Sequence, residues 1–91
     1  MFFNAIETVA AFTTSATATP ITTKTDPSYV GISIQALGGD LYYGDANVTT
    51  ATGQKLKQNE TVTFATKSPH LIHVIAAGAY DTRVALFKGT R

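Results

Sequence analysis

Short segments in which apolar and polar residues alternate restrict the fold of this chain more than any other feature. The clearest one is residues 29–36, YVGISIQA, where every second residue from Val30 to Ala36 is apolar. Successive side chains of a β-strand point to opposite faces, so a period of two predicts a strand with one buried face. The sequence therefore predicts a strand here, with Ile32 and Ile34 on its buried face.

Four further apolar segments predict an all-β domain. They are residues 41–43, 61–65, 71–77 and 82–88, and turn-forming residues lie between them. The 16 threonines of the chain also favour extended backbone, because threonine is β-branched. Several short strands at this spacing predict a small antiparallel β-sandwich or barrel, jelly-roll-like in arrangement, over residues 26–91.

Residues 1–25 are predicted to form an extended N-terminal arm. In residues 1–12, helical spacing of the apolar side chains fits better than strand spacing, so a short helix or an irregular segment is expected. Residues 13–25 have no helical period and contain Pro20, which favours an extended conformation. We expect the arm to contact a neighbouring chain; the alternative is that it supplies the first strand or two of the domain's own sheet. The predicted partner-binding residues are Phe2, Phe3, Ile6, Phe12 and Ile21.

Charge and cysteine content exclude several classes of protein. Charged residues make up 14% of the 91 residues and the net charge is +1, which is too little for strong electrostatic binding of nucleic acid. No apolar run reaches the roughly 20 residues of a membrane-spanning helix. There are no cysteines, so neither disulfides nor thiolate metal sites can form. We expect a soluble single domain without nucleic acid or membrane as a partner.

The candidate residues for catalysis or metal binding form no recognisable pattern. His70 and His73 are three residues apart, a spacing that places them on opposite faces of a strand. Ser68, His70 and Asp81 supply the residue types of a hydrolase triad, but no Gly-x-Ser-x-Gly segment accompanies them. We expect no enzyme activity, no cofactor and no metal. In a different class of function, Tyr29, Tyr42 and Tyr43 could stack on sugars, as in a carbohydrate-binding module.

Residues 41–64, LYYGDANVTTATGQKLKQNETVTF, resemble a pattern common in small structural proteins of tailed bacteriophages. There a short strand ends in tyrosine and glycine, a Val-Thr pair and a Thr/Gly turn lead to a leucine, and a turn before glutamate opens the next strand. The matching residues are Tyr43, Gly44, Val48, Thr49, Thr50, Gly53, Leu56 and Glu60. The resemblance extends loosely over residues 30–88, and Asn59 stands where glycine is more usual.

The resemblance implies a structural role in a phage virion. The expected function is that of a capsid decoration (cement) protein on the outer capsid surface, which binds the major capsid protein through non-covalent contacts and forms a homo-oligomer, expected to be a trimer. A head–tail, fibre or spike component with the same domain is the alternative within this class. An extended arm suits this role, because a strand can add to the sheet edge of a neighbour.

Overall fold

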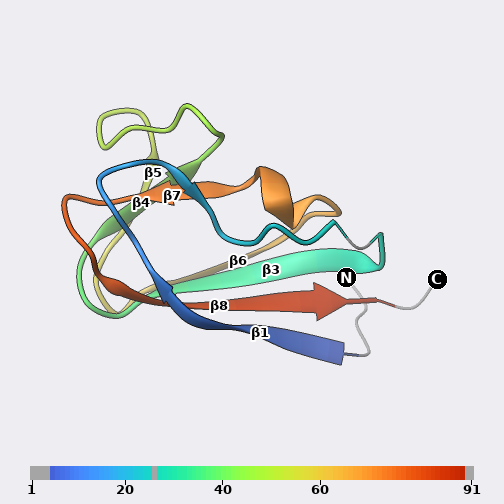
Figure 1. Cartoon of the computed structure of the whole chain (residues 1–91). Coiled ribbons are helices and arrows are strands. Elements are labelled where there is room, and N and C mark those ends of the chain that lie inside the picture. Colours follow the sequence, from blue (N-terminus) through green and yellow to red (C-terminus); the bar gives the residue numbers. More distant parts are fainter. Residues whose placement is uncertain (1–4, 26, 90–91) are drawn as a thin grey trace.

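The computed structural model describes residues 5–25 and 27–89, and it shows two four-stranded antiparallel sheets packed face to face (Figure 1). The first sheet has the order β1-β8-β3-β6 and consists of Ala5–Thr13, Asp81–Lys88, Tyr29–Ala36 and Thr61–Ala65. The second has the order β2-β7-β4-β5 and consists of Thr19–Pro20, His73–Ile75, Leu41–Gly44 and Gln54–Leu56. Eight antiparallel strands in this order form a jelly roll, so the predicted fold class is confirmed.

Most strands lie where the alternation predicts them. Four predicted segments correspond to β3, β4, β6 and β8. The apolar run at residues 71–77 differs, because a 3₁₀ helix, η1 (Pro69–Leu71), precedes it and only the three residues of β7 are a strand. β5 lies in the polar stretch before residue 61 and was not predicted. Leu56 is the only buried residue of this three-residue strand, so the sequence shows no alternation that could reveal it.

The described part of the predicted arm, residues 5–25, contributes one strand to each sheet. β1 pairs along β8, and β2 pairs with β7. The described part of this segment therefore does not form a separate arm. It supplies strands to the domain's own sheets, which was the alternative expectation. The helix considered for residues 1–12 is absent from its described part, residues 5–12. A register shift between Val9 and Phe12 disturbs the alternation, which explains why strand spacing looked poor in the sequence.

A buried threonine holds the connection between β1 and β2. Thr14 is 1% exposed, and its Oγ1 donates to the Gly78 carbonyl oxygen at 2.9 Å and accepts the N–H of Tyr80 at 3.0 Å. The N–H of Thr14 donates to the Tyr80 carbonyl oxygen at 3.0 Å. These bonds satisfy the buried hydroxyl. They also join the N-terminal segment to the turn before β8. In the described residues, position 25 is therefore not a boundary between two structural units.

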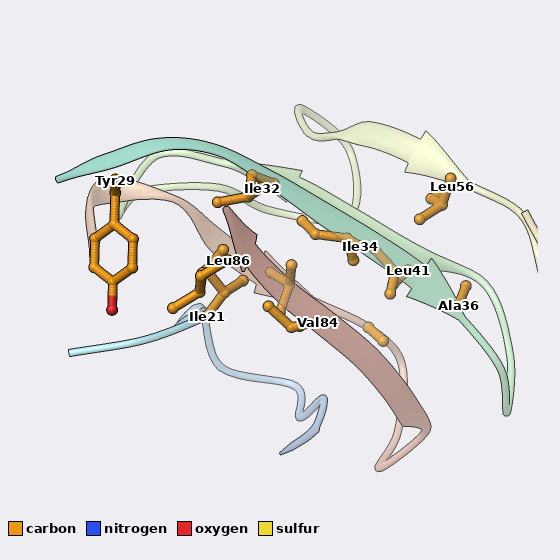
Figure 2. Close-up of a cluster of buried hydrophobic side chains, with 11 residues drawn as sticks. Ile21, Tyr29, Ile32, Ile34, Ala36, Leu41, Leu56, Val84 and Leu86 are labelled. Carbon is orange, nitrogen blue, oxygen red and sulfur yellow. The ribbon is translucent and has the colours of Figure 1, made fainter. Parts of the chain in front are cut away.

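The hydrophobic core lies between the two sheets (Figure 2). Side chains of β3 and β8 face those of β4 and β7, and the fully buried ones are Ile32, Ile34, Ala36, Leu41, Val74, Val84 and Leu86. Ile21, just after β2, belongs to the same cluster at 1% exposure. The predicted role of Ile21 as a partner contact is therefore replaced by a role in the core.

The placement of Ile21 can be tested against that of Ile6, which lies in β1 and is 59% exposed. We expect Ile21→Ala to lower the free energy of unfolding by about 2–4 kcal/mol, because it leaves a cavity in the core. Ile6→Ala deletes the same atoms at the surface and should change it by less than about 0.5 kcal/mol. Urea unfolding followed by circular dichroism measures both, and equal losses would contradict the core assignment.

Candidate functional site

The residues of the candidate catalytic triad lie at opposite ends of β3. Ser68 and His70 follow Thr66, whose N–H donates to the Val30 carbonyl oxygen near the start of that strand. Asp81 lies beyond the other end, where its carbonyl oxygen accepts the N–H of Leu37. Since β3 is eight residues long, these groups are separated by most of the length of the sheet. Across the described ranges, no three His, Asp or Glu residues are grouped so as to hold a metal ion.

The three tyrosines of the candidate sugar platform do not share a surface. Tyr29 is 1% exposed and belongs to the core cluster. Tyr42 and Tyr43 are neighbours in β4, so their side chains point to opposite faces of the second sheet. Tyr43 packs on the core side, where its ring stacks on Phe64 with a centroid distance of 6.0 Å. The predicted platform is therefore not formed.

A surface hollow of about 410 Å³ lies where β4 leads into the loop before β5. It is lined by Tyr43, Gly44, Asp45, Asn47, Val48, Thr52 and Gln54. Part of the polar lining takes part in the loop's own hydrogen bonds: Asp45 Oδ1 accepts the N–H of Asn47 at 2.9 Å, and Thr52 Oγ1 lies 2.9 Å from Thr49 Oγ1. These bonds give the loop its shape.

The motif that resembles phage structural proteins has a structural explanation in this loop. Val48 is 6% exposed, and a Cβ atom at Gly53 would lie 2.7 Å from its Cγ2 atom, so only glycine allows this packing. Asn59 has φ of 73°, the left-handed conformation that glycine and asparagine adopt most readily. The following Glu60 caps the same turn, since its Oε1 accepts the N–H of Lys57 at 2.9 Å. The motif thus specifies how the chain turns between strands.

A polar cluster around Glu7 closes one end of the sandwich. Tyr29 Oη donates to Glu7 Oε1 at 2.8 Å, Lys24 Nζ donates to Glu7 Oε2, and Lys88 Nζ lies 3.7 Å from Glu7 Oε1. Lys88 Nζ also lies 5.6 Å from the centroid of the Tyr29 ring. The Glu7 side chain is 23% exposed, so these partners replace much of its hydration. The cluster ties β1 to the start of β3, to the end of β8 and to the segment after β2.

We expect Glu7→Ala to lower the free energy of unfolding by about 1–3 kcal/mol, because it leaves the Tyr29 hydroxyl and two lysines without their common acceptor. Glu7→Gln retains an oxygen for the Tyr29 hydroxyl and should cost less than the alanine variant. Thermal and chemical denaturation of both variants measure the difference. If Glu7→Ala left the stability unchanged, the cluster would have no role in holding β1.

The outer face of the first sheet is nearly free of charge. Ile32, Ile34, Val84 and Leu86 point into the core, so the residues between them point outward. The strand register extends this to β1 and β6. We call the outer face the set Ile6, Thr8, Gly31, Ser33, Gln35, Thr61, Thr63, Ala65, Arg83, Ala85 and Phe87. Arg83 carries a positive charge, and Asp81, two residues earlier on the same side of β8, adds a negative charge at the end of this face.

Sequence reasoning missed this surface, although a signal exists. The outward positions of the alternating strands hold mainly Gly, Ser, Thr, Ala and Gln and few charged residues. The four strands are far apart in the sequence, so the charge-poor positions become one surface only when the strand order is known.

The predicted partner-binding residues are divided between surface and interior. Ile6 lies on the outer face. Phe12 is half-buried and packs against the core, and Ile21 is buried within it. Phe2 and Phe3 lie outside the described residues. Of the three that the structure describes, Ile6 is the one on an open surface.

Comparisons with known proteins add no assignment: no family model, no curated protein and no solved structure matches this chain. In the described ranges, the structure contains no helix long and apolar enough to cross a membrane.

Proposed function

We propose that this protein is a capsid decoration (cement) protein of a tailed phage, which binds the major capsid protein from the outer surface of the shell through non-covalent contacts. The observation that carries the proposal is the long open edge of the jelly roll. β1 is nine residues long and ends the order of the first sheet, and β8 is its one neighbour among the described strands. Eight-stranded jelly rolls are common in viral capsid proteins, although a fold by itself does not define a function.

The β1 edge offers a physical basis for attachment to a shell. A strand at a sheet edge presents backbone N–H and C=O groups that another chain can pair with, and proteins usually protect such edges. An extended segment of the major capsid protein could add to β1 as a further strand, with main-chain hydrogen bonds providing the contact. Glu7 is engaged on the inner side by Tyr29, Lys24 and Lys88, so little charge opposes this approach. A protein that binds the assembled shell and not its free subunits stabilises the shell by mass action.

Quantitative mass spectrometry of purified virions from the phage that encodes this chain tests the proposal. We expect a copy number that scales with the major capsid protein. The protein should also stay bound when the salt concentration is raised to about 1 M, because main-chain and apolar contacts are screened far less than surface ion pairs. The portal protein, present as a single ring, serves as the internal standard.

Other copy numbers would contradict the decoration role. A count equal to a single ring or a few fibres would place the protein at the head–tail junction, in a fibre or in a spike. Absence from the virion would contradict a structural role of any kind in the particle.

A further inference from the structure

The hollow beside the loop before β5 lies where the second sheet extends past the first. Tyr43 of β4 and Gln54 of β5 are paired in the register, so their side chains point to the same side of the sheet. Tyr43 packs against the core, so this side faces the first sheet. Gln54 is nevertheless exposed, because the first sheet does not reach over it. The volume of about 410 Å³ is within the range of small-molecule sites, roughly 300–1,000 Å³.

Hydrogen bonds within the loop fix the walls of this hollow. The N–H of Val48 donates to the Asp45 carbonyl oxygen at 3.1 Å, and the N–H of Gly53 donates to the Thr49 carbonyl oxygen at 2.9 Å. The side chain of Val48 is 6% exposed and anchors the loop. Because the loop is held by its own contacts, a ligand does not have to order it on binding, and this lowers the cost of association.

Three polar side chains of the lining keep hydrogen-bonding capacity that the loop does not use. The side-chain amides of Asn47 and Gln54 have no hydrogen-bond partner within residues 5–25 and 27–89. Asp45 uses Oδ1 to accept the N–H of Asn47, which leaves Oδ2 for a ligand. An amide group both donates and accepts, whereas a carboxylate oxygen only accepts. The hollow therefore offers donors and acceptors together.

The charge of the lining limits the ligands that fit. Asp45 is the one charged residue among the residues that line the hollow. Lys55 follows Gln54 but points to the opposite face of β5, and its Nζ lies 3.6 Å from Asp40 Oδ2. An anionic ligand would therefore meet a carboxylate with no cation to offset it. A calcium ion takes about six to eight oxygen ligands, usually with several carboxylates, and the described residues contain no such cluster.

We propose that this hollow binds a neutral saccharide. Sugar hydroxyl groups donate and accept hydrogen bonds, which matches the amides of Asn47 and Gln54, and Asp45 Oδ2 can accept from a further hydroxyl. The apolar C–H groups of a sugar ring can pack on Tyr43 and Val48, which line the same hollow. The site is open and offers few hydrogen bonds, so the dissociation constant should be on the order of 1 mM. The inference goes beyond the proposed function, because it concerns a different surface from the β1 edge.

An NMR titration of the ¹⁵N-labelled full chain tests the proposal. The probes are glucose, galactose, mannose, N-acetylglucosamine and disaccharides of each, up to about 50 mM. At least one should cause saturable shifts of the amide signals of residues 43–54, with the signals of β1 unchanged. Gln54→Ala should weaken this binding by about tenfold, because it removes up to two hydrogen bonds. Gln35→Ala deletes the same side chain from β3 in the other sheet and should leave the binding unchanged.

Asn47→Ala is a second variant, because the loop uses the backbone N–H of this residue and not its side chain. It should weaken the binding as Gln54→Ala does. Four results would overturn the proposal: no saturable shift at residues 43–54 with any of these sugars, equal effects of Gln54→Ala and Gln35→Ala, binding of sialic acid or sulfated sugars in place of neutral ones, or loss of binding in EDTA. The saccharide site and the virion role fail separately, since the titration uses the isolated chain and the virion role depends on copy number in particles.

Discussion

The pairing of β8 with both β1 and β3 is the interaction on which the rest of the structure depends. β8 is the last strand of the chain, yet it lies between the first strand and the third in the first sheet (Figure 1). Val84 and Leu86 of this strand lie in the centre of the core. The sheet therefore cannot be completed before almost the whole chain is available. Such long-range pairing is slow to form, because each contact closes a long loop.

The parts of the fold that the sequence predicts are those where one strand alternates regularly. β3 alternates from Ile32 to Ala36 and β8 from Asp81 to Leu86, so both strands are evident, and their register then places Ser33 and Ala85 outward. β1 was not evident, because its register shift breaks the alternation and its partner strand lies at the opposite end of the sequence. The burial of Ile21 could not be predicted either, since it depends on the path between β2 and β3 in space. The candidate surface needed the order of strands, which alternation alone does not provide.

The sandwich separates residues that hold it together from surfaces that can contact partners. The resembling motif, with Val48, Gly53 and Asn59, defines loop and turn geometry. Glu7 uses its carboxylate within the chain. What remains on the first sheet is the edge of β1 and the outward-facing side chains, which take no part in the core.

The central claim is that residues 5–25 are part of the sandwich, and removing the N-terminal segment, residues 1–25, tests it most directly. The chain shortened to residues 26–91 loses β1, β2 and the buried Ile21. Amide NMR spectra and urea unfolding of the full and shortened chains provide the comparison. The account predicts that the shortened chain either shows no cooperative unfolding or is less stable by more than about 3 kcal/mol. A dispersed spectrum together with the stability of the full chain would contradict it and would make the segment a separate arm.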